Sequence, residues 1–181
     1  MSEIADDYMR ERNLNFDDDE DLWQWRYTNY GENRWYVGPA VNNTRDEEGF
    51  LTQGKALYIS NNGGLNNTYN NTVASTSYFS TLIHIQDSTY YGIEFDYKMI
   101  GESYLDRLTV FLLPLYAELT TNISGATTLG TLQNTSNAWR KFEQPFPENL
   151  SEGDYQLVFC WENDNNAGQN PPAAIDNLKV Y

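Results

Sequence analysis

The stretch YYGIEFDYKMI, residues 90–100, carries the clearest structural pattern in this chain. Tyr91, Ile93, Phe95 and Tyr97 alternate with Gly92 and three charged residues. Because successive side chains of a β-strand point to opposite faces, this period of two gathers the apolar groups on one face. The stretch therefore predicts a half-buried strand with one face against a core and one polar face.

Similar strand patterns recur on both sides of this stretch. They cover the ranges 14–16, 33–43, 55–60, 76–85, 105–114, 138–146, 153–164 and 173–181. Residues 105–114 and 153–164 are apolar on both faces, so we expect them at the centre of a sheet. No segment predicts a strong helix, and Asn, Gly and Thr gather in the connections. The sequence predicts an all-β fold, a two-sheet β-sandwich of about eight or more strands, and its long loops favour a jelly-roll topology.

The domain organisation follows from the length and from the first residues. A chain of 181 residues is expected to form one domain. Residues 1–13 are charged and lack a strand pattern, which predicts an N-terminal linker or arm before a jelly-roll domain at 14–181. The first residues also lack the apolar stretch of a signal peptide, which leaves open an intracellular protein or the mature fragment of an exported one.

The net charge excludes some classes of binding partner. With 26 acidic residues against 11 basic ones the formal charge is −15, so we expect no binding to nucleic acid and no attraction to an anionic membrane surface. No 18-residue apolar stretch occurs, which predicts no direct insertion into a membrane. The negative charge does favour the binding of cations.

The residues that commonly carry catalysis are scarce. His84 is the only histidine and Cys160 the only cysteine, a composition that makes a zinc site or a nucleophile–histidine pair improbable. Cys160 lies in the apolar run YQLVFCW and is expected to be a buried hydrophobic residue. Glu94 and Asp96 share a strand face about 7 Å apart, a separation that suits a glycosidase, although a polar outer face predicts the same pair without catalysis.

A candidate metal site links the two ends of the chain. Asp17 follows the apolar Phe16 in the acidic run FDDDEDLW, and Asp176 follows Ile175 in the last strand. In a jelly roll the termini commonly lie on neighbouring strands, so both carboxylates are expected to face one cation. Oxygen atoms of Asn61 and Asn62 would complete the shell that calcium requires. The alternative is a solvated acidic loop plus an Asp–Asn turn.

The aromatic residues allow two interpretations. Trp23, Trp25, Tyr27 and Tyr30 lie beside polar residues in LWQWRYTNY. Exposed flat rings stack on sugars or anchor protein partners, which makes these four residues candidate ligand-binding groups. The same alternation is also typical of an ordinary strand that covers a core. Three further tryptophans lie in apolar strands and are expected in the core: Trp35, Trp139 and Trp161.

Several motifs in series resemble a known family. The order NFDDDE, RWYVG, KALYISNNGG, YYGIEFDYKMIGES, GDYQLVFCWEND and NPPAAIDNLKV is similar to the choice-of-anchor J domains and the related cleaved-adhesin domains, which belong to the MAM-like jelly rolls. The resemblance covers about residues 14–181. It implies a noncatalytic, exported β-sandwich with a structural calcium near the joined termini, held here by Asp17 and Asp176. The family often begins Phe-Glu-Asp where this chain has Phe16-Asp17-Asp18, so Asp18 or Asp19 is an alternative ligand.

The expected function is therefore that of a noncatalytic extracellular or cell-surface binding module, part of a larger surface or secreted protein. Its partner would be an extracellular glycan or a host or matrix protein, and calcium would be a structural cofactor. The alternatives are a purely structural spacer domain and, less favoured, a glycoside hydrolase-like enzyme. The loops at 61–72, 115–135 and 163–172 are the expected places for a site, because loops carry function on such frameworks.

Overall fold

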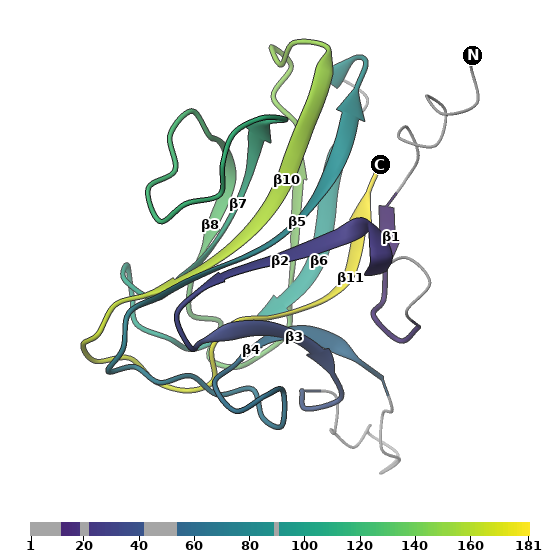
Figure 1. Ribbon diagram of the computed structural model, residues 1–181. Coiled ribbons are helices and arrows are strands. Elements are labelled where there is room, and N and C mark those ends of the chain that lie inside the picture. The colour runs from purple at the N-terminus through teal and green to yellow at the C-terminus, as the bar shows by residue number, and fades with distance from the viewer. Residues whose placement is uncertain (1–11, 19–21, 42–53, 89–90) are drawn as a thin grey trace.

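The computed structural model describes residues 12–18, 22–41, 54–88 and 91–181, which fold into two packed antiparallel sheets (Figure 1). The predicted all-β jelly-roll sandwich is thereby confirmed. Leu22–Gln24 forms a single 3₁₀ turn. None of the helices in these ranges is long and apolar enough to cross a membrane.

The first sheet has six strands in the order β3-β4-β11-β6-β9, with β1 also paired to β11. Its strands are β1 (Arg12–Leu14), β3 (Arg34–Gly38), β4 (Ala56–Ser60), β6 (Gly92–Lys98), β9 (Arg140–Pro145) and β11 (Ala174–Val180). The second sheet has five strands in the order β2-β5-β10-β7-β8. These are β2 (Trp25–Tyr30), β5 (Ser75–Ile85), β7 (Arg107–Pro114), β8 (Thr127–Leu132) and β10 (Gly153–Asn163).

The core lies between the two sheets and is built from the apolar faces that the alternation predicts. Phe95 of β6 meets Phe159 of β10 across the layers, with ring centroids 5.2 Å apart. Phe16, Phe79 and Trp161 are also completely buried in this cluster. Burial of such aromatic surface removes apolar area from water and is the main source of stability for a sandwich.

The central strands are those that the sequence marks as apolar on both faces. β10 is paired along most of its length with β5 on one side and β7 on the other. Residues 92–98 of the opening stretch form β6, which lies between β11 and β9. A strand with neighbours on both edges and layers on both faces needs apolar residues at consecutive positions, which explains the loss of simple alternation in β7 and β10.

Three expectations need correction. The region 115–135, expected to be irregular, contains β8, whose pattern is hidden because Gly130 interrupts the apolar positions Leu129 and Leu132. Trp139, expected in the core, is 37% exposed, and the Lys98 ammonium lies 5.0 Å from the centre of its ring. The predicted arm at 1–13 lies mostly outside the described residues, but its last two positions belong to β1.

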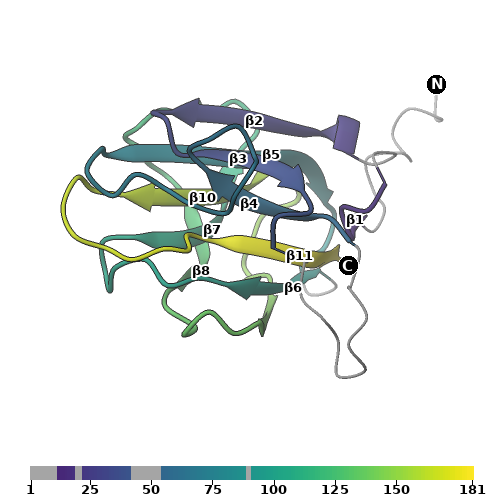
Figure 2. The same cartoon turned by 90° about the horizontal axis from the view of Figure 1, so that it is seen from below.

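The two ends of the domain meet, as the sequence predicts. β1 pairs antiparallel with β11, and Leu14 lies opposite Leu178 (Figure 2). The pairing of β11 with β6 shifts register between Asp176 and Lys179, where Asn177 has a φ of 50°. A bulge of this kind re-aims side chains. The Asn177 side-chain amide donates a 2.9 Å hydrogen bond to Asp96, so the Asp–Asn pair has a local structural role within the last strand.

Candidate functional site

The outer face of the second sheet carries an unusual amount of apolar surface. Alternate residues of β5, β7 and β10 that point away from the main core form a second buried cluster, here called the outer cluster: Tyr78, Phe111, Leu113, Val158 and Cys160. The connection from β7 to β8, residues 115–126 (the covering loop), folds back over it, and three of its apolar side chains pack on the cluster: Ala117, Leu119 and Ile123. The covering loop thereby removes part of this face from water.

Polar contacts fix the covering loop on the sheet. The Gln156 side-chain amide donates hydrogen bonds to three backbone carbonyls around the start of the loop, those of Pro114, Leu115 and Ala117. The Tyr30 hydroxyl donates to the carbonyl of Leu119 at 2.7 Å, and the Tyr78 hydroxyl donates to that of Thr120 at 2.6 Å. These five bonds come from three strands, so the path of the loop is set by the sheet beneath it.

A pocket of about 430 Å³ remains beside the covering loop, a volume in the range of small-ligand sites. We call it the outer pocket. Its floor includes Tyr78, Phe111 and Cys160. Its polar lining consists of hydroxyl, amide and charged side chains: Arg107, Thr109, Thr121, Asn122, Thr128, Thr131 and Glu162. Arg107 and Glu162 form an ion pair at 3.0 Å, and both side chains are partly open to solvent.

The floor of the outer pocket is uncharged at neutral pH. Burial raises the pKa of the Cys160 thiol well above its usual value, and the nearby Glu162 carboxylate adds to this. Burial likewise raises the pKa of the Tyr78 hydroxyl. The protonated thiol is a poor nucleophile, because the thiolate is the reactive form. The pocket therefore combines a neutral floor with a rim of hydrogen-bonding groups, an arrangement suited to recognition of a neutral polar ligand.

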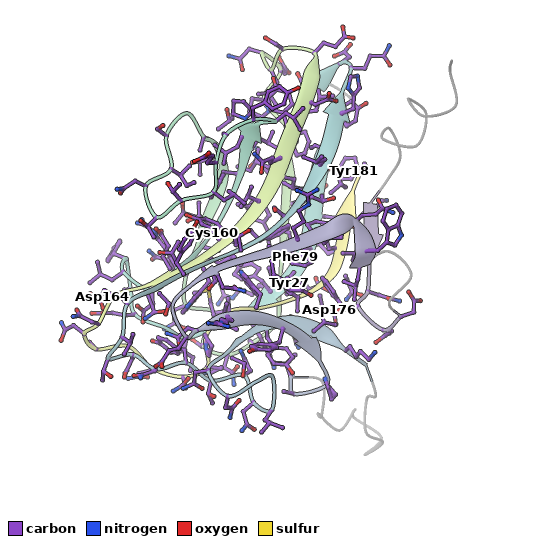
Figure 3. All side chains as sticks on the ribbon, in the orientation of Figure 1. Tyr27, Phe79, Cys160, Asp164, Asp176 and Tyr181 are labelled. Carbon is purple, nitrogen blue, oxygen red and sulfur yellow. The ribbon has the colours of Figure 1, made fainter. Side chains whose placement is uncertain are left out.

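The four predicted aromatic residues do not form one stripe. Trp25 is 5% exposed and stacks on Phe79 at 4.5 Å between ring centroids, so its face is covered by the core. The Tyr27 ring also contacts that of Phe79, with centroids 5.2 Å apart, and 45% of the Tyr27 surface is exposed (Figure 3). Tyr30 points to the opposite face, beside Tyr78 of the outer pocket. Trp23, in the 3₁₀ turn, is 78% exposed. The strand period separates positions 25 and 27 from position 30.

The predicted metal ligands fall into two separate places. Asp17 lies where β1 meets β11, and its carboxylate accepts a 2.7 Å hydrogen bond from the backbone amide of Lys55, just before β4. Asp176 lies in β11 and accepts a bond from the amide of Asn177. Asp18 is exposed next to Asp17, whereas Asp19 lies outside the described residues. Asp17 therefore follows β1 and Asp176 lies in β11, the two strands that pair where the ends of the domain meet.

Asn61 and Asn62 are at the other end of β4. Six residues of extended chain separate Lys55 from Asn61, which corresponds to roughly 20 Å. The Asn61 side-chain carbonyl accepts a bond from the Thr68 hydroxyl, and that of Asn62 accepts from Ser60 and from the amide of Asn66. Both side chains organise the turn after β4, and the structure does not bring them to Asp17.

Two further sets of acids differ in their surroundings. Glu94 and Asp96 project from β6, where Glu94 lies 3.8 Å from the Lys141 ammonium and Asp96 accepts from Asn177; neither lines the outer pocket. The second set is a group of three acidic residues that the sequence does not predict: Glu102, Asp106 and Asp164. Among the described residues, these three bring their carboxylate oxygen atoms close to one another, at a place where loops of the sandwich meet. The only sequence signal is that two of them border β7 and β10.

Comparison with known proteins gives structural neighbours only. No protein-family model matches the chain, and no curated protein sequence matches it. The K1 cleaved adhesin domain of Lys-gingipain from Porphyromonas gingivalis W83 superposes with a TM-score of 0.56 and 11% identity, over 95% of this chain and 98% of that one. The CBM22-1 xylan-binding domain of Paenibacillus barcinonensis Xyn10C gives 0.51 and 11%, over 93% and 91%.

A third neighbour is TmCBM61, solved in complex with β-1,4-galactotriose. It superposes with a TM-score of 0.51 and 11% identity, over 87% of each chain. At this level of identity the three similarities establish a shared fold, that of an adhesin-like and carbohydrate-binding-module-like β-sandwich. They do not single out the choice-of-anchor J family, which stays a prediction from the sequence.

Proposed function

We propose that this domain is a noncatalytic glycan-binding module and that the outer pocket is its binding site. The observation that carries the proposal is the lining of the pocket. Hydroxyl groups of Thr109, Thr128 and Thr131, the Asn122 amide and the Arg107–Glu162 pair surround an apolar, uncharged floor. A sugar ring has the matching character, with hydroxyl groups at its edge and C–H groups on its faces.

Two of the structural neighbours support the same proposal, one through its bound ligand and one through its described binding function. One was solved with β-1,4-galactotriose, and another is described as a xylan-binding domain. Fold similarity alone does not transfer a ligand, so the argument rests on the pocket in this chain. The aromatic ring that stacks on the sugar would be that of Tyr30, because it lies beside the pocket, whereas Trp25 is buried.

The setting and the cofactor belong to the same proposal. We infer an extracellular or cell-surface module of a larger protein, with an adhesin-like role; a host or matrix protein as ligand is the second candidate. We also retain a structural calcium at the joined ends, with Asp17, Asp18 and Asp176 as ligands. The antiparallel pairing of β1 with β11, the strands next to and containing these acidic residues, supports it. Such an ion would supply a positive charge that holds these carboxylates together.

The test is a glycan array probed with the labelled domain, followed by calorimetric titration of β-1,4-galacto- and xylo-oligosaccharides. Two variants change the pocket: the double variant Arg107→Ala/Glu162→Ala removes its ion pair, and Thr131→Trp fills it. Each should weaken binding at least about tenfold, a loss of about 1.4 kcal/mol. The matched control is Glu94→Ala/Lys141→Ala, which removes an ion pair from the other sheet. Binding that survives both pocket changes would reject the outer pocket as the site, and an array without hits would favour a structural spacer.

A further inference from the structure

Two loops meet at one end of the sandwich and bring three carboxylates together. Glu102 and Asp106 lie in the connection from β6 to β7, and Asp164 lies just after β10. Their ligand oxygen atoms are all within 4.8 Å of one another. The two connections are also tied by their backbones, because Gly101 and Gln169 exchange hydrogen bonds at 2.8 and 3.2 Å. We call these three residues the acidic cluster.

The acidic cluster contains buried oxygen atoms that nothing satisfies. Asp106 is 1% exposed, and although the Tyr69 hydroxyl donates to its Oδ2, its Oδ1 is buried without a hydrogen-bond partner. The Oε2 of Glu102 is likewise buried and without a partner. A buried carboxylate oxygen with no donor is costly, so such atoms in a folded domain call for a ligand.

No cationic side chain compensates these charges in the described ranges. The ion pairs there join Arg107 to Glu162, Lys141 to Glu94 and His84 to Asp154. A positive charge between the three carboxylates would relieve their mutual repulsion in this partly desolvated place.

We propose that the acidic cluster is a binding site for a divalent cation of the calcium type. All three side chains offer oxygen atoms, the hard ligands that calcium prefers, and neither histidine nor cysteine is among them, as zinc would require. Oxygens from separate loops do not impose the strict octahedral geometry that magnesium demands. Because the cluster joins the loops before β7 and after β10, a bound ion would clamp these two strands at one end.

The surrounding chain is shaped to this cluster. Gly168 has a φ of 89°, and a Cβ at that position would overlap both the Tyr69 hydroxyl and the Asp106 carboxylate. A Cβ at Gly101 would approach the Asp106 side chain to 3.0 Å. Two positions without side chains therefore let the backbone of both loops pack directly against Asp106.

The site is separate from the joined ends of the domain. Figure 3 shows Asp164 and Asp176 on opposite sides of the molecule. It is, however, continuous along the chain with the outer pocket, since Arg107 follows Asp106 and Glu162 stands two residues before Asp164. A clamp on these strand ends would also hold the Arg107–Glu162 pair in place. The cation site itself does not depend on the glycan proposal.

The experiment measures calcium binding and melting temperature on the whole domain after treatment with chelator. Glu102→Gln/Asp164→Asn removes two carboxylates that are not fully buried, so this variant should fold. Glu94→Gln/Asp154→Asn is the matched control, because these two carboxylates pair with Lys141 and His84 and belong to neither proposed cation site. We expect calcium to raise the melting temperature of the wild type and of the control. In the Glu102→Gln/Asp164→Asn variant the affinity of this site should fall more than about 100-fold, beyond the loss usual for outer-shell changes.

Terbium luminescence gives a second measurement on the unmodified protein. Tyr69 touches Asp106, and the Trp161 ring lies 5.5 Å from that of Tyr69, so excitation of these rings should sensitise an ion held by the cluster. We expect a signal that calcium displaces and that the Glu102→Gln/Asp164→Asn variant lacks. The proposal is overturned if that variant binds calcium as the wild type does, if the wild type binds none, or if the control loses all binding.

Discussion

The side-chain amide of Gln156 in β10 donates a 2.7 Å hydrogen bond to the backbone carbonyl of Ala117, in the loop that covers the outer face of the second sheet. The same amide nitrogen also reaches the carbonyls of Pro114 and Leu115. One side chain in the middle of a sheet thus anchors the start of a twelve-residue connection, residues 115–126. The shape of the outer pocket depends on this anchor, because Asn122 and Ile123 of the loop are part of its wall.

Replacement of this anchor should loosen the loop without unfolding the sheet. Gln156→Ala removes the side-chain donor from the carbonyls of Leu115 and Ala117, for which we expect a loss of about 1–3 kcal/mol in the free energy of unfolding; the Pro114 carbonyl keeps the bond from the Ala117 amide. Hydrogen–deuterium exchange should increase within residues 115–126. Gln144→Ala is the control, because its amide donates only to the adjacent Pro145 carbonyl. Unchanged exchange in the covering loop would show that apolar packing alone holds it.

Trp25 and Trp23 should differ sharply when each is replaced by alanine. Trp25→Ala removes a buried ring stacked on Phe79 and should cost about 3–5 kcal/mol in urea unfolding. Trp23→Ala removes a ring that is 78% exposed and should change stability by less than about 0.5 kcal/mol. Equal effects would contradict the assignment of Trp25 to the core.

Gly168 should be much less tolerant of alanine than Gly125. Both residues have a positive φ, 89° and 75°, so each substitution carries a backbone strain of about 1–2 kcal/mol. A Cβ at Gly125 meets nothing within 4 Å, whereas one at Gly168 overlaps Tyr69 and Asp106. We expect Gly168→Ala to cost about 2–5 kcal/mol in total, as overpacking adds to strain. Similar midpoints for the two variants in thermal or urea unfolding would count against the close packing at Asp106.

The Cys160 thiol should be unreactive in the native domain. Because burial raises its pKa, the folded state holds the thiol protonated at neutral and mildly alkaline pH, and the thiolate forms mainly after unfolding. As pH rises through the ordinary thiol pKa, the unfolded state loses its proton first, so stability should decrease with increasing pH in that range. A thiol reagent at pH 8 should label the protein slowly in buffer and rapidly in urea; fast labelling of the folded domain would disprove this.

The sequence predicts the strands well because the burial of a strand face produces a local alternation of apolar and polar residues. The alternation in residues 90–100 predicts β6, and the loss of alternation in 153–164 predicts a central β10. Where glycine breaks the period, as at Gly130 in β8, the same reasoning fails. It also fails for Trp139, which lies just before the edge strand β9 rather than in it and is 37% exposed.

The candidate sites were predicted less completely, and the reason is distance along the chain. Asp17 and Asp176 were placed at joined ends because the fold class itself brings termini together. Asn61 and Asn62 were placed there too, although they follow β4 at its other end and shape their own turn. Nothing in the local pattern states which end of a strand faces which loop.

The sequence by itself determined that this chain forms β-strands, which strands are central, and that two apolar layers pack together, since a period of two in hydrophobicity is a local property. Only the tertiary structure decided that residues 115–126 fold over the outer face and leave a pocket, and that Glu102, Asp106 and Asp164 converge. These arrangements depend on strand order and register, which place loops distant in the chain side by side through contacts that no local pattern encodes.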